Sequence, residues 1–368
     1  MTDPERLMAL AMALAGRSLW LTSPNPRVGC VIADDHGQIL GQGHTQKAGG
    51  AHAEIAALQD ARQQGHAVQG ATAYVTLEPC AHQGRTGPCC DALIAAGIQR
   101  VVAAIEDPNP LVSGQGFDRL RAAGIDVEIG LGAAESRELN LGFFSRMIRK
   151  TPWVRIKIAA SLDGKTALDN GASQWITSEA ARADGHAWRA RACAVLTGIG
   201  TVLEDNPRLD VRLVSTERQP ALVVVDSRME TPLDAHLLIA GRACYIYAAA
   251  TNGLKKDALQ AQGATVITLP GAHGKVDLAA MLRDLAERGI NELHVEAGEK
   301  LNGSLIRENL VDEFVIYLAP KLIGQGRGMA SFGPLSSLAQ AIPLEFNSCD
   351  PLGPDLRVVV RVSQRDRF

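Results

Sequence analysis

The 368-residue sequence lacks several features that would place it quickly in a class of protein. It has no apolar run long enough to span a bilayer, and residues 1–6 lack the basic region of a secretory signal peptide. Aromatic residues make up only 4% and the formal net charge is −3, which argues against a nucleic-acid-binding surface. The seven cysteines are odd in number and irregularly spaced, which favours reduced thiols or metal ligands over a disulfide framework. Together these absences favour a cytoplasmic enzyme.

The length predicts two domains, because one core rarely serves a chain of this size. A helix expected over residues 136–150 ends in basic side chains, which suit a helix C-terminus, and Thr151-Pro152 then stops it. We therefore expect one domain at residues 1–150 and a second at residues 151–368.

Four residues of the first domain indicate its chemistry most strongly. His52, Cys80 and Cys89 supply one imidazole and two thiolates, the ligand set of a catalytic zinc ion that keeps a fourth position open for water. Bound zinc lowers the pKa of that water to about 7, and Glu54 is then free to carry protons. His-x-Glu followed by Pro-Cys is typical of zinc-dependent nucleobase deaminases, although eight residues separate the two cysteines here instead of the usual two.

The sequence leaves alternatives to this ligand set. Cys90 directly follows Cys89 and competes as the third ligand. We favour Cys89 because it follows Pro88 at the start of a predicted helix, where the N-terminus stabilises a thiolate. A structural zinc site would need a fourth ligand, which His82 could supply, but Glu54 at its spacing argues against that interpretation.

The hydrophobic pattern of the first domain predicts strands that alternate with helices, and hence an α/β sandwich with a largely parallel sheet. One helix begins near His52 and another at Cys89, whereas Cys80 follows a predicted strand at residues 73–77. The metal is therefore expected between the starts of two helices.

Three polar residues near this region are candidate substrate contacts. Asn25 lies between two prolines, which hold its amide rigidly enough to recognise a base edge. Arg85 and Lys47 are candidates for phosphate, although Lys47 is more typical of a solvated surface cation.

The second domain also alternates predicted strands and helices, but its motifs alone indicate a cofactor only weakly. Gly198-Ile199-Gly200 follows a predicted strand and lacks the third glycine of a dinucleotide fingerprint. Residues 296–304 follow another strand and open a helix, where small residues let backbone N–H groups approach a diphosphate.

Three stretches of the first domain resemble a known family. They read PNPRVGCV at 24–31, HAE at 52–54 and LEPCAHQGRTGPC at 77–89, and they are similar to the bifunctional deaminase/reductase of riboflavin biosynthesis. The long spacing between Cys80 and Cys89 is normal in that family, whereas Gly87 and the doubled Cys89-Cys90 are small departures. The resemblance implies a cytidine-deaminase-like three-layer α/β domain that holds one Zn²⁺. Its substrate would be a diaminopyrimidinone with a ribosylamino 5-phosphate, which loses its 2-amino group as ammonia.

The second domain resembles the reductase half of the same family in IKIAASLDGK at 156–165, SQWIT at 173–177, GTVLEDNP at 200–207 and EAG at 296–298. This implies a dihydrofolate-reductase-like α/β domain that uses NADPH to reduce the ribosyl group to a ribityl chain. The residues implied to line the cofactor are Ala159, Trp175, Thr201, Asp205 and Ser227, with Gly298, Glu299, Lys300, Leu301, Asn302, Gly303 and Ser304 around its diphosphate. Those implied to hold the substrate are Ser173, Arg189, Leu209, Arg212 and Glu296, and Lys157, Asp205 and Glu296 are candidates near the reacting sugar carbon.

Two other interpretations compete with this one. A nucleic-acid base deaminase with a C-terminal RNA- or DNA-binding domain predicts basic patches with interleaved aromatics, which the composition opposes. A non-catalytic zinc-binding interaction protein is the second. We expect a phosphorylated pyrimidine as substrate, no nucleic-acid or membrane partner, and a homo-oligomer.

Overall fold

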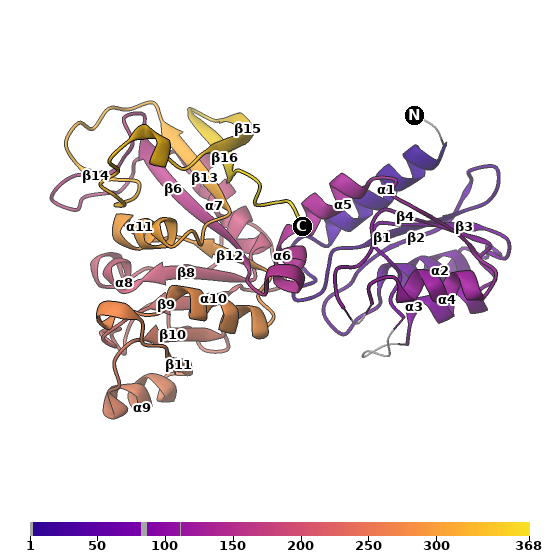
Figure 1. The fold of residues 1–368 in the computed structure, drawn as a ribbon, viewed down its shortest axis with the longest axis horizontal. Helices are drawn as coiled ribbons and strands as arrows, with labels where there is room; N and C mark the ends of the chain where they lie inside the picture. The colour runs from indigo at the N-terminus through magenta and orange to yellow at the C-terminus, as the bar shows by residue number, and fades with distance from the viewer. Residues whose placement is uncertain (1–2, 82–86, 111) are drawn as a thin grey trace. The chain divides into compact units, whose positions relative to one another are not determined.

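A computed structural model describes residues 3–81, 87–110 and 112–368 (Figure 1). The chain divides into two compact units, Met1–Arg149 and Lys150–Phe368, and each has a sheet and a core of its own. Among the described residues, none of the helices is both long enough and apolar enough to cross a membrane.

The first unit is built on a five-stranded sheet of order β2-β1-β3-β4-β5. Its strands are β1 (Gly29–Ala33), β2 (Ile39–His44), β3 (Thr72–Val75), β4 (Arg100–Ala103) and β5 (Asp126–Ile129). Its helices are α1 (Asp3–Arg17), α2 (Ala53–Gln63), α3 (Cys89–Ala95), α4 (Gln115–Ala122), α5 (Ala133–Leu139) and α6 (Leu141–Arg149). Figure 1 shows α1 and α5 on one face of the sheet and α2, α3 and α4 on the other, so the unit has three layers.

Two expectations for this unit are wrong. The sheet is mixed, because β1 pairs antiparallel with both β2 and β3, and only β3, β4 and β5 run parallel. The helix expected over residues 136–150 is interrupted at Asn140, whose backbone is not helical (φ −118°, ψ 18°). The Asn140 side chain accepts a hydrogen bond from Arg27 N at 2.8 Å and donates one to Arg27 O at 2.9 Å, so a contact with a distant segment ends the helix.

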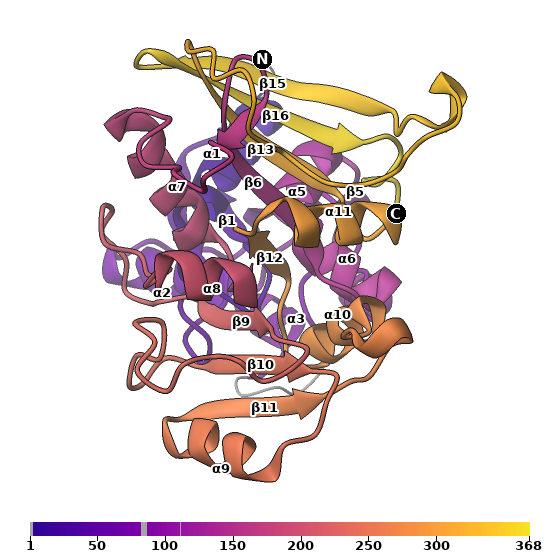
Figure 2. The ribbon, with the colours of Figure 1, turned by 90° about the vertical axis from the view of Figure 1, so that its left-hand side faces the viewer.

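The second unit is built on a nine-stranded sheet of order β11-β10-β9-β8-β12-β6-β13-β16-β15. Neighbouring strands run parallel from β11 to β13, and β16 and β15 add antiparallel at one edge, as Figure 2 shows. These strands are β6 (Trp153–Ser161), β8 (Ala194–Gly198), β9 (Ala221–Val225), β10 (Cys244–Ala248), β11 (Ala264–Thr268), β12 (Glu292–Val295), β13 (Glu313–Ala319), β15 (Leu344–Leu352) and β16 (Asp355–Val362). The helices are α7 (Glu179–Arg191), α8 (Ile199–Asp205), α9 (Gly253–Ala261), α10 (Leu278–Glu287) and α11 (Glu299–Arg307), and β7 (Lys165–Ala167) pairs with β14 (Arg327–Gly328).

Alternation along the strands assigns each helix to a face of this sheet, because successive side chains of a strand point to opposite faces. Val154 and Ile156 of β6 share one apolar cluster with Leu282 of α10 and Leu305 of α11. On the opposite face, β8 to β11 pack against α8 and α9, and β13 and β16 pack against α7. The sheet is therefore covered by helices on both faces.

Three elements of this unit were not expected from the sequence. Helix α8 begins at Ile199, directly after Gly198, in the stretch that resembles an incomplete dinucleotide fingerprint. Strand β15 is largely exposed and contains Pro351, so it lacks the alternation that marks a half-buried strand. Strand β16, which pairs with β13 on one side and with β15 on the other, was missed with it.

Charged side chains are buried between the sheet and α7. Arg155 on β6 is 1% exposed and contacts two equally buried carboxylates, Glu292 on β12 at 3.0 Å and Glu313 on β13. Each carboxylate has a second arginine, since Arg191 contacts Glu292 at 2.9 Å and Arg361 contacts Glu313 at 3.0 Å. Buried charges are tolerated only when they are paired and hydrogen-bonded, and Arg155 is the cation that these two carboxylates share.

We predict that Arg155→Met lowers the free energy of unfolding of the second unit by about 3–5 kcal/mol, because it leaves two buried carboxylates with one cation each. Urea unfolding monitored by the fluorescence of Trp153, Trp175 and Trp188 measures this loss. The substitution should leave the unfolding transition of the first unit unchanged.

The control is Arg228→Met, which removes an exposed ion pair with Glu230 in the same unit. Its expected cost is below about 1 kcal/mol, the usual value of a surface pair. Equal shifts for the two variants would contradict the importance of the buried charges.

Candidate functional site

Three donor atoms meet at one edge of the first unit. His52 Nδ1 lies 3.6 Å from Cys80 Sγ and 3.4 Å from Cys89 Sγ, and the three atoms lie within 4.8 Å of one another. His52 is the N-cap residue of α2, Cys89 is the first residue of α3, and Cys80 lies on the segment after β3. The structure thus brings together the three predicted metal ligands from separate parts of the chain.

These separations fit a tetrahedral zinc ion. Zinc–sulfur bonds of about 2.3 Å and zinc–nitrogen bonds of about 2.0 Å place the nitrogen and sulfur ligands about 3.5 Å apart. The two distances from His52 are close to this value. One imidazole and two sulfurs leave one tetrahedral position for water, which is the arrangement of a catalytic site.

Cys90 points away from this cluster. Its thiol donates to Pro79 O at 3.1 Å and to Gly116 O at 3.5 Å. Consecutive residues of a helix are turned by about 100°, so Cys89 and Cys90 cannot both face the same point. His82 and Arg85, the other candidates in this segment, lie outside the described residues.

Glu54 lies beside the cluster on the first turn of α2 and is 3% exposed. Burial raises the pKa of its carboxyl group to about 7, and the nearby Cys80 sulfur adds to the increase. The backbone N–H of Cys89 donates to Cys80 Sγ at 3.4 Å, and the hydrogen bond from the Cys89 thiol lowers the pKa of Cys80 well below its ordinary value. The site therefore combines a thiolate with a carboxyl group suited to accept and release a proton near neutral pH.

A second buried carboxylate, Glu78, orders the segment that carries Cys80. Glu78 accepts backbone N–H groups from Asp107 at 3.1 Å, Gly114 at 3.0 Å and Gly116 at 2.8 Å. A Cβ at position 116 would lie 2.1 Å from Pro79 O, so this approach requires glycine. The sequence analysis assigned Glu78 no role, because the amide groups that it binds are 29 to 38 residues away.

The other candidates of the first unit lie in loops. Asn25 is half-buried in the turn before β1, where its backbone N–H donates to Thr22 O at 2.7 Å. Lys47 is exposed in the loop between β2 and α2, as expected of a surface cation.

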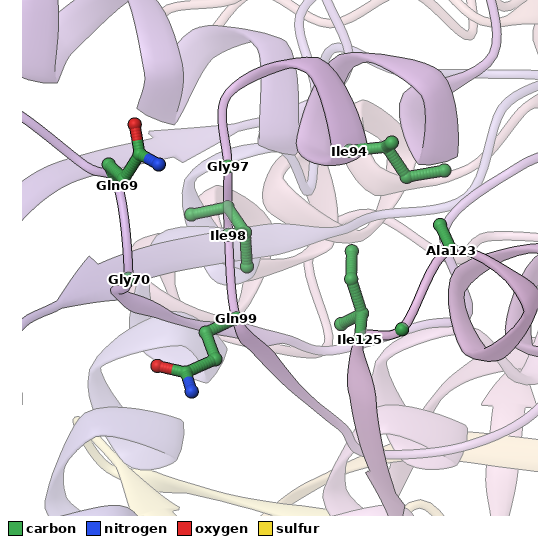
Figure 3. A pocket seen from close by; sticks show the side chains of 9 residues that line it. Gln69, Gly70, Ile94, Gly97, Ile98, Gln99, Ala123 and Ile125 are labelled. Atoms are coloured by element: carbon green, nitrogen blue, oxygen red, sulfur yellow. The ribbon is translucent and has the colours of Figure 1, made fainter.

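A surface hollow of about 340 Å³ lies at the other edge of this sheet (Figure 3). It is lined by residues that precede β3, β4 and β5, among them Gly70, Gln99 and Ile125, and by the end of α3. The strands β3, β4 and β5 start there, whereas Cys80 follows the end of β3, so the hollow is separate from the cluster of His52, Cys80 and Cys89.

In the second unit, most of the residues implied for the cofactor lie where parallel strands end. This edge is the usual ligand-binding edge of a parallel sheet. The residues are Ala159 near the end of β6, Thr201 and Asp205 on α8 after β8, Ser227 after β9, and Gly298 to Ser304 after β12.

Arg189 of α7 joins several of the residues implied for the substrate. Its Nε contacts Glu296 Oε1, its Nη2 donates to Glu296 Oε2 at 2.9 Å, and its Nη1 donates to Asp210 O at 3.0 Å. The Asp210 carboxylate accepts from Arg212 Nη1 at 2.7 Å. Arg212 is 53% exposed and accessible to a ligand, whereas the Leu209 side chain is buried in the core against α8.

The N-terminal turn of α11 begins at Gly298, where an added Cβ would meet open space in the described part of the chain. The next turn contacts protein instead. Asn302 donates its side-chain N–H to Met329 O at 3.0 Å, and a Cβ at Gly303 would lie 1.8 Å from Ser331 O. The first turn of this helix, from Gly298 to Leu301, is therefore better placed for a diphosphate than Asn302 and Gly303.

Three further candidates differ in exposure. Ser173 is half-buried and Trp175 is 63% exposed in the loop between β7 and α7, with the Arg182 guanidinium 4.6 Å from the centre of the indole ring. Lys157 lies on β6, and burial lowers the pKa of its ammonium group while Glu296 opposes that change.

Two family models match the chain. The RibD C-terminal domain matches residues 152–358, and the cytidine and deoxycytidylate deaminase zinc-binding region matches residues 1–105. The riboflavin biosynthesis protein RibD of Escherichia coli is 44% identical and the alignment covers 96% of this chain and 97% of the relative. The Aquifex aeolicus protein of the same name is 42% identical, with 95% and 96% covered.

Solved structures agree. Acinetobacter baumannii RibD shares 40% identity at a TM-score of 0.89, with 98% of this chain and 99% of that chain covered. A Thermotoga maritima diaminohydroxyphosphoribosylaminopyrimidine deaminase/5-amino-6-(5-phosphoribosylamino)uracil reductase shares 32% identity at a TM-score of 0.86, with 98% and 99% covered.

These findings confirm the α/β fold class and the two enzyme activities predicted from the resemblance, and they do not support a nucleic-acid base deaminase. The chain has a zinc-binding deaminase domain and a reductase domain. It belongs to the RibD family of bifunctional deaminase/reductases of riboflavin biosynthesis.

Proposed function

We propose that residues 1–150 deaminate a diaminopyrimidinone with a ribosylamino 5′-phosphate, and that residues 151–368 reduce the ribosyl group of the product to a ribityl chain with NADPH. The observation that carries the proposal is the cluster of His52, Cys80 and Cys89 donor atoms beside the buried Glu54. The name of the Thermotoga maritima relative, which gives both reactions, supports this substrate.

In the first reaction, His52, Cys80 and Cys89 would hold the zinc ion, and bound zinc supplies a water that ionises near neutral pH. Glu54 would accept a proton from that water and deliver a proton to the departing amino group, which leaves as ammonia. Burial of Glu54 supports this role, because it keeps the protonated and ionised forms of the carboxyl group close in free energy.

In the second reaction the cofactor carries the hydride, and the protein binds and orients both molecules. Gly298 and the first turn of α11 would face the diphosphate of NADPH, with Trp175 and Thr201 among the other contacts. Arg189 and Arg212 would hold the substrate phosphate, because a guanidinium presents a planar set of donors that matches phosphate oxygens. Lys157 and Glu296 would lie near the reacting sugar carbon.

We also infer a cytoplasmic location, because a reducing compartment keeps the thiols of Cys80 and Cys89 available to a metal ion. A homo-oligomer is supported by strand β15, which ends the nine-stranded sheet. Phe346 on this strand is 78% exposed and the nearby Leu338 is 93% exposed. A second copy of the chain that pairs with β15 would cover both the free strand edge and these side chains.

Neighbouring cysteines test the ligand set. Cys89→Ser should lower the zinc content and abolish ammonia release, because it removes a sulfur ligand. Cys90→Ser is the matched control and should keep its zinc, since its thiol faces Pro79 O and Gly116 O. Metal analysis of the two purified proteins makes the comparison, and loss of zinc from the Cys90 variant alone would reverse the assignment.

The proton-transfer role is tested with Glu54→Gln. We expect the rate of ammonia release to fall by about 10²- to 10⁴-fold, the usual contribution of general acid–base catalysis. Zinc content and NADPH oxidation with previously deaminated substrate should be unchanged, because neither depends on Glu54. A variant that releases ammonia at the normal rate would remove Glu54 from the mechanism.

The oligomer is tested with Phe346→Asp, which places a charge on the exposed face of β15. We expect association to weaken by about 10-fold or more in sedimentation experiments, because the variant loses an aromatic side chain that the second copy would bury. Leu254→Asp is the control, since Leu254 is 87% exposed on α9, far from β15 in the strand order. Equal sedimentation of both variants and the unmodified protein would rule out β15 as the interface.

A further inference from the structure

A buried histidine, His294, lies next to the pair formed by Arg189 and Glu296. It sits on β12 and is 0% exposed. Its neighbours Leu293 and Val295 point into the apolar cluster of α10 and α11. By strand alternation, His294 faces the opposite side of the sheet together with Glu292 and Glu296, where α7 lies.

The two carboxylates on either side of His294 along β12 are each paired with an arginine of α7. Arg191 contacts Glu292 at 2.9 Å, and Arg189 contacts Glu296 through two nitrogens. His294 Nε2 lies 3.5 Å from Glu296 Oε1. Among the described residues, neither ring nitrogen of His294 has a hydrogen-bond partner.

An imidazole buried in this way is unfavourable. A buried polar group without a hydrogen bond costs more than an apolar side chain of similar size, because its interaction with water is lost and not replaced. A hydrogen bond from an imidazole N–H to a carboxylate has a length of about 2.9 Å, so a shift of well under 1 Å would allow His294 to bond to Glu296.

Substrate binding would provide the reason for that shift. Arg189 directs two of its nitrogens at Glu296 and the third at Asp210 O, so all three are already engaged. A phosphate that binds Arg189 in the bidentate manner, through Nε and Nη2, would draw these N–H groups away from Glu296. Glu296 would then lose a donor in a buried site, where an unpaired carboxylate is costly.

We propose that His294 is a positioning residue of the reductase site. When the substrate binds Arg189, the Nε2–H of His294 donates a hydrogen bond to Glu296 Oε1 in place of Arg189. His294 then keeps Glu296 oriented toward the substrate. Burial supports a neutral imidazole, since it lowers the pKa of His294, and a neutral ring has one N–H to donate. The inference rests on the proposed assignment of Arg189 and Glu296 to the substrate.

Two variants with amide side chains test the proposal, because each places an N–H donor at a different distance from the backbone of β12. The amide nitrogen of His294→Gln falls near the position of Nε2, whereas that of His294→Asn falls near Nδ1 and is too short to reach Glu296. We expect the KM for 5-amino-6-(5-phosphoribosylamino)uracil to rise about 10-fold in the Asn variant, the effect of losing one hydrogen bond to a charged group. The Gln variant should stay within about 3-fold of the unmodified enzyme, with the KM for NADPH unchanged in both.

Deamination by the same chain reports on the integrity of each preparation, since its site lies in the other unit. Arg191→Met is the matched structural control, because it disrupts the neighbouring pair with Glu292 on the same helix and strand. It should lower the stability and leave the KM unchanged. Equal KM values for the Gln and Asn variants, or a similar rise in KM for Arg191→Met, would overturn the role of His294.

Glu296→Gln separates this inference from the function on which it rests. If the Glu296 variant binds and reduces the uracil substrate normally, the assignment of Glu296 to the substrate is wrong, and the inference fails with it. If Glu296→Gln raises the KM and His294→Asn does not, only the role of His294 is lost. A positioning role further requires that His294→Asn adds nothing when Glu296 is already replaced by Gln.

Discussion

The convergence of helix starts at one edge of a sheet is the constraint on which both sites depend. A parallel strand must be followed by a segment that returns across the sheet, so strand ends and helix N-termini collect on the same side. In the first unit this edge brings His52 at the start of α2 and Cys89 at the start of α3 next to the segment after β3. In the second unit, α8 begins directly after β8, and α11 begins a few residues after β12. The N–H groups at a helix N-terminus stabilise negative charge. The same arrangement of strand ends and helix starts therefore favours a thiolate in the first unit and suits a diphosphate in the second.

Buried charge is distributed unevenly in the second unit. One face of its sheet is apolar under α10 and α11, whereas the face under α7 carries ion pairs along β6, β12 and β13. These pairs continue from Arg155 in the interior to Arg189 and Glu296 at the ligand-binding edge. Because a buried ion must keep its partner, helix α7 is held in one position relative to the strands. The residues that hold the substrate in the proposed function thereby belong to the same charged layer as those that stabilise the fold.

The sequence was sufficient to predict features that depend on residue type and local spacing. His52, Glu54, Cys80 and Cys89 were singled out because their residue types and spacing indicate a specific chemistry. The choice between Cys89 and Cys90 required knowing which face of α3 points to the cluster. The apolar pattern of a seven-residue helix does not define that face. The break at Asn140 and the role of Glu78 depend on partners more than 25 residues away. Strand β15 was missed because an exposed edge strand has little apolar alternation to detect.

The close contact between Gly116 and Pro79 has a consequence for the metal ligand that follows Pro79 in the chain. Pro79 is joined by a peptide bond to Cys80, so any side chain at position 116 must displace the backbone that precedes a proposed metal ligand. The space at position 116 therefore bears on the geometry of the metal site as well as on folding. Gly116, the second residue of α4, thereby limits where the backbone of this metal-binding segment can lie.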